Sequence, residues 1–495
     1  MDVLHSLMLG FSVALTPTNI FYAFFGCIVG TVIGVLPGIG PLCTIALILP
    51  TTFSMNPTSA MIMMCAVYYG AQYGGSTTSI LINVPGESAS VMTCIDGYQM
   101  ARNGRAGVAL AMSAISSFVC GTLSVVALML MAPPLAKFAL SFGPPEYFSL
   151  MLLGLTTIVF LGGRSILKSI VSIILGLLLG LIGVDPVGGV NRFTFGSLVL
   201  IDGIDFIVVV MGIFGIGEVL VSAEERMKIS ILKTKISGLI PTLKDWKDST
   251  GAMIRGFFIG FIIGVLPGTG ATIASFLSYA TEKMVSKHPE EFGKGAIAGV
   301  AGPEGANNAA VAGAMVPLFT LGIPGSGTAA VMLGAMMMWG LRPGPLLFVQ
   351  HPDFVWGIIA SMYVGNVVLL ILNLPLVPLF AAMLRVPYAI LYPFILILCA
   401  TGVYSLDSSM FEVYLMFFFG VIGYFVKKLD FPPAPIVLAL ILGPMVERAL
   451  YQSLTISHGS FSIFVTRPYS AVFLVMVFMV LTVPVARWWR QKNKA

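Results

Sequence analysis

The chain consists mostly of long apolar runs separated by short polar or glycine- and proline-rich segments. Several runs are nearly free of charge and about as long as the roughly 20 residues that a helix needs to cross a bilayer core. They are residues 107–133, 147–161, 169–183, 206–221, 354–384 and 468–485. None shows the strict two-residue alternation that is typical of an outer-membrane β-strand. The pattern therefore predicts an all-α polytopic membrane protein.

The composition agrees with this interpretation. Of the 495 residues, 57% are hydrophobic and 9% are charged, whereas a soluble domain carries about 25% charged residues. The six cysteines stand singly in apolar segments without a neighbouring histidine, so neither a zinc site nor a disulfide framework is indicated. No G-x-x-x-x-G-K-[ST] phosphate loop occurs, and ATP hydrolysis by this chain is not expected. We predict no cofactor, and no metal other than sodium.

Two stretches of the sequence repeat. "GTVIGVLPGIGP" at 30–41 returns as "GFIIGVLPGTGA" at 260–271, and in both copies glycines four residues apart lead into the same GVLPG. Farther on, "GGSTTSILINVPGESAS" at 74–90 matches "AGAMVPLFTLGIPGSGTA" at 312–329. These matches predict two homologous halves.

The expected organisation has four parts. A first transmembrane repeat (1–222) is followed by a basic linker (223–252), a second repeat (253–466), and an extra helix with a basic tail (467–495). By the positive-inside rule, the linker and the C-terminus are expected in the cytoplasm. Nucleic-acid binding is not expected, because the basic residues flank helices and are diluted by apolar ones.

The orientation of the two halves in the membrane follows from whether each half crosses it an odd or an even number of times. The extra helix has no counterpart at the end of the first half, and the second half together with this helix starts and ends in the cytoplasm. Without the extra span, each repeat crosses the membrane an odd number of times. The sequence therefore predicts inverted-topology repeats with a periplasmic N-terminus, an arrangement that is typical of secondary transporters.

The repeated proline-glycine segments are expected to break their helices. Proline lacks an N–H donor, and glycine adopts dihedrals that other residues resist. In lipid, irregular backbone is tolerated only inside protein or beside a wet cavity. Broken helices or re-entrant hairpins at 36–40, 83–88, 266–270 and 322–327 would therefore form a central site, where helix N-termini attract an anion and free carbonyls bind sodium.

Small polar residues around these breaks are the candidate substrate- and ion-binding residues. They are Gly38, Gly40, Ser76, Thr77, Thr78, Asn83, Gly86 and Ser88 in the first half, and Gly268, Gly270, Asn307, Asn308, Thr320, Gly325, Ser326 and Thr328 in the second. The alternative is that such residues only pack helices together, as is common in membrane proteins.

Three acidic residues lie beside the breaks. Glu87, Asp96 and Glu304 are candidates for coupling to a proton or sodium gradient, because ionisable groups at membrane depth are costly and usually functional. Water-solvated positions at loop ends are the alternative. No catalytic residues are predicted: "PGSG" at 324–327 lacks the first glycine of a G-x-S-G nucleophile segment, and the histidines lie in polar or terminal contexts. An intramembrane enzyme and a passive anion channel are the competing hypotheses.

The blocks "GVLPGIGP", "YGGSTTSILINVPGESASVMTCIDGYQMARNGRAG" and "GPEGANNAAVAGAMVPLFTLGIPGSGTAAVMLGAMMMWGLRPGP" resemble the large membrane subunit of the bacterial tripartite tricarboxylate transporters, over about residues 19–450. The resemblance implies a permease of the inner membrane that works with a small membrane subunit and a periplasmic solute-binding protein. It further implies import of carboxylates such as citrate, driven by a sodium or proton gradient. By fold-level analogy, the core is similar to elevator-type carriers.

Overall fold

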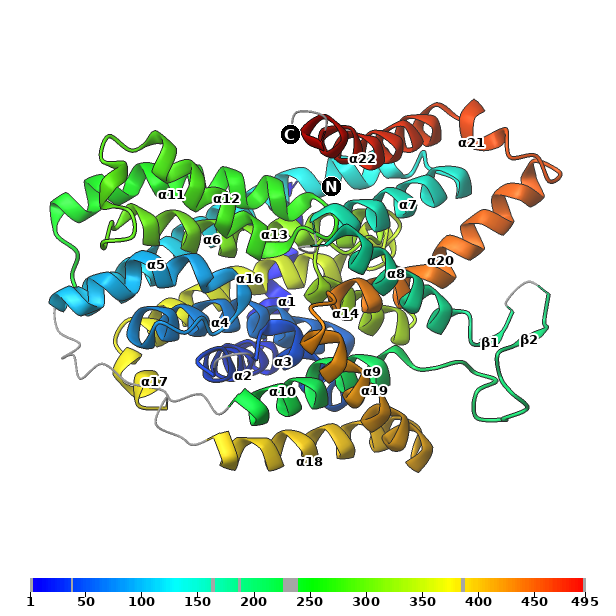
Figure 1. Ribbon diagram of the computed structural model, residues 1–495, viewed down its shortest axis with the longest axis horizontal. Coiled ribbons are helices and arrows are strands. Elements are labelled where there is room, and N and C mark those ends of the chain that lie inside the picture. Colours follow the sequence, from blue (N-terminus) through cyan, green and yellow to red (C-terminus); the bar gives the residue numbers. More distant parts are fainter. Residues whose placement is uncertain are drawn as a thin grey trace.

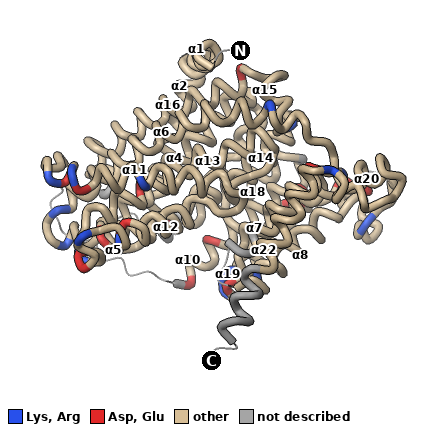
Figure 2. Tube along the Cα trace, turned by 90° about the horizontal axis from the view of Figure 1, so that it is seen from above, with Lys and Arg blue, Asp and Glu red and all other residues tan. Residues whose placement is uncertain are grey.

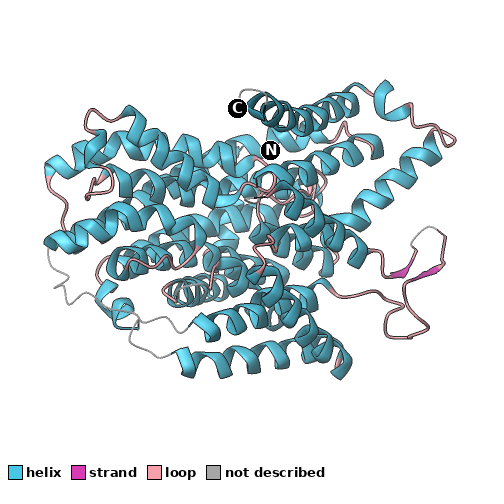
Figure 3. Ribbon diagram, in the orientation of Figure 1, coloured by secondary structure: helices cyan, strands magenta, loops and turns pink. Residues whose placement is uncertain are grey.

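The computed structural model describes residues 3–36, 39–161, 165–185, 188–225, 239–383 and 388–492. Figure 3 shows that these ranges are almost entirely helical; the strands within them are β1 (Gly183–Val184) and β2 (Asn191–Arg192), which pair antiparallel. Seven helices of the described chain are long and apolar enough to cross a membrane. The predicted all-α polytopic membrane protein is confirmed.

The helices before the basic linker include long spans and short connecting pieces. They are α1 (Val3–Ala14), α2 (Pro17–Gly34), α3 (Pro41–Ile48), η1 (Leu49–Thr52), α4 (Pro57–Ile82), η2 (Ser88–Ser90), α5 (Val91–Met100), η3 (Ala101–Arg105), α6 (Ala106–Ala139), α7 (Pro144–Leu161), α8 (Ile166–Gly180), α9 (Phe206–Val210), η4 (Met211–Ile216) and α10 (Gly217–Glu225).

A similar series follows the linker. It comprises α11 (Leu243–Val265), α12 (Gly270–Val285), η5 (Pro289–Glu291), α13 (Ala298–Leu321), α14 (Gly327–Met338), α15 (Leu347–Gln350), α16 (Pro352–Asn373), α17 (Val377–Met383), α18 (Tyr388–Asp407), α19 (Met410–Lys428), α20 (Ala434–Ile456), α21 (Ile463–Thr466) and α22 (Pro468–Lys492). Figure 1 shows most of these helices running roughly along the long axis, with the β1–β2 hairpin projecting at one end.

Two expected boundaries differ in the structure. The apolar run 354–384 is not one helix: α16 ends at Asn373 and α17 begins at Val377, because Pro375 cannot continue the hydrogen-bond ladder. Helix α11 begins at Leu243, inside the expected linker, where Thr242 and Asp245 form a reciprocal capping box. Much of the linker, residues 226–238, lies outside the described residues.

The two halves share a close backbone packing. Gly30 and Gly34 of α2 lie against the backbone of Val67 and Ala71 on α4, and a Cβ at either glycine would collide with it. In the second half, Gly260 and Gly264 of α11 lie in the same way against Ala306 and Ala310 of α13. Small residues let two helices approach this closely. The matching contacts support the predicted duplication.

Some helices of each half pack on helices of the other half. Helix α6 packs along α13 of the other half, and α16, which has the same place in the chain order, packs on α4. Likewise, α8 packs on α20, whereas α19 packs on η4 and α10. Exchange of this kind is expected when two repeats are related by an approximate two-fold axis. The direction of each half in the membrane stays a prediction.

Two groups of helices can be distinguished by their contacts. One contains α1–α6 and α11–α16, which include all four helix breaks; the other contains α7–α10 and α18–α22. Figure 2 shows Lys, Arg, Asp and Glu residues gathered beside α5 and α11 and near α20, with further ones beside α10, α15 and α19, while the part of the bundle around α4, α6 and α13 is largely uncharged. This distribution is expected for helices that cross a bilayer.

Candidate functional site

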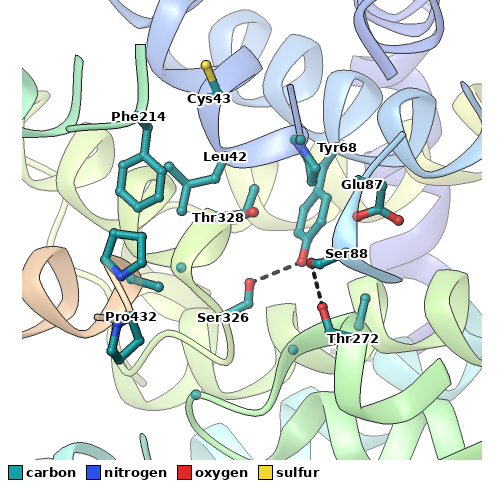
Figure 4. Close-up of a pocket in the computed structure, with 18 of the residues that line it drawn as sticks. Leu42, Cys43, Tyr68, Glu87, Ser88, Phe214, Thr272, Ser326, Thr328 and Pro432 are labelled. Atoms are coloured by element: carbon teal, nitrogen blue, oxygen red, sulfur yellow. Dashed lines mark hydrogen bonds between the residues drawn. The ribbon is translucent and has the colours of Figure 1, made fainter. Parts of the chain in front are cut away.

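A cavity of about 660 Å³ lies where the two helix groups meet. All four breaks contribute to its wall: residues 40–43 and 85–88 come from the first half, and residues 268–273 and 326–328 from the second. The second helix group adds Phe214, Glu218, Lys427 and residues 432–435. Segments far apart in the sequence therefore surround one space (Figure 4).

Each break presents the start of a helix to the cavity. Helix α3 begins at Pro41, η2 at Ser88 leads into α5, α12 begins at Gly270, and α14 begins at Gly327. Helix α20 starts at Ala434, which also lines the cavity. The first N–H groups of a helix have no intrahelical partner, and the helix dipole places about half a positive charge there. Several such ends together favour an anion.

The breaks after α4 and α13 have the same local construction. Asn83 and Gly322 end these helices in the left-handed conformation, with φ of 58° and 69°. Three residues later in each half, Gly86 packs against Gly34 and Gly325 against Gly264, where no side chain would fit. Left-handed backbone and close approach are what Asn and Gly allow. The repeated proline-glycine segments thus turn the chain back towards the cavity.

The residues that begin the next helices differ. Ser326 caps α14 by accepting a hydrogen bond from the Ala329 N–H at 3.1 Å. At the equivalent position, Glu87 caps η2 through a capping box with Ser90. Glu87 is buried at the cavity wall, and its Oε1 has no hydrogen-bond partner. The cavity therefore has a free carboxylate oxygen at one break and a hydroxyl at the other.

Hydrogen bonds join the two halves across the cavity. The Tyr68 hydroxyl of α4 lies 3.0 Å from Ser326 Oγ, and Ser88 Oγ lies 2.7 Å from Thr272 Oγ1 of α12. Figure 4 shows both contacts on the polar side of the cavity, with Leu42, Phe214 and Pro432 on the other side. The wall thus combines hydroxyl groups with an apolar surface, as small-molecule sites commonly do.

The charged groups of the cavity wall are few. Lys427 of α19 forms an ion pair with Glu218 of α10, and both are partly buried. Glu87 is the remaining charged side chain among the described lining residues. When Glu87 is ionised, Lys427, Glu218 and Glu87 together carry one negative charge, which repels a carboxylate. Binding of a carboxylate is therefore favoured when Glu87 is neutralised or when Lys427 turns from Glu218 to the ligand.

Glu304 lies outside the cavity wall, in the N-terminal part of α13. Its side chain is 0% exposed and accepts hydrogen bonds from Ser76 of α4 at 2.5 Å and from Thr93 of α5. On the next turn of α13, Asn308 donates to Asn307 Oδ1 at 2.5 Å and to Ser117 of α6 at 2.8 Å. Glu304 thus lies in a polar cluster that is formed by both halves.

Asp96 has a different environment. Its Oδ1 accepts three backbone N–H groups, from Gly293, Gly295 and Ala296, at 2.8 to 2.9 Å, and its Oδ2 accepts the Tyr279 hydroxyl at 2.8 Å. These bonds attach the loop before α13 to α5. The geometry favours a structural role for Asp96 over the coupling role considered from the sequence.

The structure brings only part of the sequence-predicted set to the cavity. Lining residues are Gly40, Gly86, Glu87, Ser88, Gly268, Gly270, Ser326 and Thr328. Away from its wall lie Ser76, Thr77, Thr78, Asn83, Asn307, Asn308, Thr320, Gly325, Asp96 and Glu304. Gly38 lies outside the described residues. Of the second group, Thr78 and Thr320 hydrogen-bond to carbonyls of their own helices, at Gly75 and Val316.

Sequence reasoning missed several lining residues. Tyr68 and Gln72 precede the polar "GGSTTS" stretch on the same face of α4, which a helical projection would have shown. Lys427 and the segment 432–435 come from the second helix group. A lysine at the end of an apolar helix, followed by "FPPAP", was the available signal for both.

Comparisons with known proteins agree on the kind of protein. The sequence matches the tripartite tricarboxylate transporter TctA family over residues 20–438. It is 48% identical over 476 residues to an uncharacterized 52.8 kDa protein in the TAR-I ttuC' 3'region of Agrobacterium vitis, covering 96% of this chain and 95% of the relative. An uncharacterized protein in the TAR-II ttuC' 3'region of the same organism is 47% identical over 215 residues, which is 43% of this chain and 89% of the relative. No solved structure matches.

Proposed function

The chain belongs to the tripartite tricarboxylate transporter TctA family, and from this membership we propose that it is the permease subunit of a binding-protein-dependent secondary active transporter. Its substrates are tricarboxylates or related organic acids, imported with a sodium or proton gradient. Its partners are a small membrane subunit and a periplasmic solute-binding protein. It resides in the bacterial inner membrane, with the N-terminus in the periplasm and the linker and C-terminus in the cytoplasm.

One observation carries the proposal: four helix starts, two from each half, line a single cavity. Each helix N-terminus favours negative charge, and several together suit an anion with more than one carboxylate. Lys427 supplies a cation at the same wall, and hydroxyls such as Ser88 and Thr328 supply donors. The cavity therefore has the donors that a small carboxylate requires, at the depth where broken helices meet.

Alternating access requires that the cavity open to either side of the membrane in turn. The helices with the breaks form one group, and the cavity lies where this group meets α10, α19 and α20. Sliding of one group against the other, as in elevator-type carriers, would expose the site in turn to the two sides. Hydrogen bonds such as Tyr68–Ser326 and Ser88–Thr272 join elements within the break-bearing group and would move with it.

Uptake of radiolabelled citrate into proteoliposomes tests the proposal. The vesicles contain this chain with the small membrane subunit, and the binding protein is added outside. We expect accumulation above the external concentration that requires both the binding protein and an inward sodium or proton gradient. Equilibration without accumulation would indicate a passive channel, and chemical conversion of citrate would indicate an enzyme.

A further inference from the structure

Glu304 is a buried acid without a counter-charge. Its side chain is 0% exposed, and among the described residues no Lys, Arg or His forms an ion pair with it. An ionised carboxylate away from water is costly unless a cation neutralises it. Glu304 therefore requires a mobile neutralising partner, either a proton or a metal cation.

The hydrogen bonds of Ser76 fit a proton. Ser76 Oγ lies 2.5 Å from Glu304 Oε2 and 3.1 Å from the backbone carbonyl of Gln72. The hydroxyl carries one hydrogen and can donate to only one of them. When Glu304 is ionised, Ser76 donates to the carboxylate. When Oε2 carries a proton, the carboxyl group donates to Ser76 Oγ, and Ser76 donates to the Gln72 carbonyl.

Both states of Glu304 are thus satisfied by rotation of one hydroxyl. A sodium ion would need several oxygens arranged around it, whereas Ser76 and Thr93 already lie within hydrogen-bond distance of the carboxylate. These hydroxyls hydrogen-bond to both carboxylate oxygens without a metal ion. The geometry therefore favours the proton as the partner.

A polar face of α4 connects the cavity to this site. Tyr68, Gln72 and Ser76 are four residues apart and lie on one side of the helix. Tyr68 and Gln72 line the cavity, and Ser76 contacts Glu304. The Gln72 Oε1 atom is buried without a hydrogen-bond partner. It can therefore accept a hydrogen bond from a water molecule that carries the proton. A proton has a short polar path from the cavity to Glu304.

Other titratable groups approach Glu304 from each packed element. Tyr73 of α4, Cys94 of α5 and Glu87 at the break interact with it electrostatically. From α6, Cys120 lies beside Gly305, the residue that follows Glu304. The ion pair of Arg255 (α11) and Glu282 (α12) is beside Gly302. None of these is a free cation.

The repeat does not account for Glu304. The matched segments pair Pro85 with Pro324, and the same spacing pairs Glu304 with Cys65. Both residues are buried in the N-terminal part of equivalent helices, α13 and α4. Since the first half packs with a small apolar side chain at this place, helix packing does not require an acid there.

We propose that Glu304 carries the coupling proton, which it takes up from the cavity with the substrate and releases on the other side, with Ser76 exchanging acceptors at each step. This inference rests on the proposed transport function. The proton binds to Glu304 Oε2 and leaves from the same atom, so no other bond is formed or broken.

The test separates coupling from transport in the reconstituted tripartite assembly. One assay measures accumulation of radiolabelled citrate driven by an inward proton gradient, and the other measures citrate exchange across the membrane without any gradient. Glu304→Gln should lower accumulation by about tenfold or more while exchange stays within about twofold of the wild type. Ser76→Ala should lower accumulation, whereas Ser76→Thr, which keeps a hydroxyl, should accumulate citrate as the wild type does. Glu290→Gln, the same change in the exposed element η5, is the matched control.

Several outcomes would overturn the inference. They are gradient-driven accumulation by Glu304→Gln, and wild-type accumulation that follows a sodium gradient but not a proton gradient. If Glu304→Gln loses exchange as well, the two Ser76 variants are compared in the accumulation assay. An equal loss of accumulation in Ser76→Ala and Ser76→Thr would contradict the proposal. Absence of both exchange and accumulation in the wild type would instead refute the transport function itself.

Discussion

The hydroxyl of Tyr68 in the first half contacts Ser326 Oγ in the second half, at 3.0 Å. Ser326 also caps α14 by accepting the Ala329 N–H, so its hydroxyl contacts both Tyr68 and the first turn of α14. Both side chains lie at the cavity wall (Figure 4). The contact therefore joins α4 of one half to a helix N-terminus of the other, where the substrate carboxylate is proposed to bind.

Tyr68→Phe should weaken substrate binding without unfolding the protein. The ring stays in place, and one hydrogen bond of about 1 kcal/mol is lost, so the apparent KM for citrate should rise about fivefold. Uptake kinetics in proteoliposomes measure this change. Tyr363→Phe is the control, because Tyr363 lies on α16 and stacks on Phe11 away from the cavity. An unchanged KM in Tyr68→Phe would show that the hydroxyl does not shape the site.

Alanine at Gly34 or at Gly264 should destabilise the protein by similar amounts. A Cβ at Gly34 would collide with the backbone of Ala71, and one at Gly264 with that of Ala310. Overpacking of this kind costs about 1–3 kcal/mol. Thermal unfolding in detergent measures the loss. Gly365→Ala in α16 is the control, since its Cβ would meet nothing closer than Cys27 Sγ at 3.8 Å, and it should be neutral or slightly stabilising.

Lys427 should be needed for carboxylate affinity. We expect Lys427→Gln, combined with Glu218→Gln so that no unpaired acid remains, to raise the KM for citrate by about tenfold or more, because a charge-assisted hydrogen bond is worth about 1.5–3 kcal/mol. The neighbouring Lys428 pairs with Glu224 outside the cavity, with half of its side chain exposed. Lys428→Gln should therefore leave the KM unchanged. Equal effects at both lysines would argue against a direct contact with substrate.

Asp96→Asn should reduce stability while leaving ion dependence intact. The change removes the charge that attracts three backbone N–H groups and the Tyr279 hydroxyl, and a cost of about 2–3 kcal/mol is expected. Thermal unfolding should show the loss. The dependence of uptake on proton and sodium gradients should match the wild type, whereas a shift in that dependence would return Asp96 to the coupling candidates.

Much of the fold could be predicted because the relevant signals are local. Apolar length marks the spans, and a proline-glycine segment ends a helix whatever surrounds it: α4 ends at Ile82 and α13 at Leu321, each directly before the predicted break. The break in the run 354–384 is not marked by hydropathy, because the residues around Pro375 are as apolar as the helices on either side. The start of α11 at Leu243 was missed because its polar first turn resembled linker.

The candidate site was predicted only in part. The sequence predicts a central site formed by the repeated breaks, and segments 85–88 and 326–328 both line the cavity. Which flanking side chains reach the cavity depends on helix rotation, and Thr320 turns back to its own helix while Thr328 faces the space. Lys427 and Phe214 come from helices whose packing no local pattern specifies.

The sequence by itself determined that this chain is helical, made for a membrane, internally repeated and broken at four places, because these properties follow from residue chemistry over a few turns of helix. Only the tertiary structure decided that four helix starts share one cavity, that Asp96 is bound by a loop, and that Glu304 is buried without a cation. Those properties depend on the distance between side chains more than a hundred residues apart. Such distances are set by packing of the whole bundle, which no single segment contains.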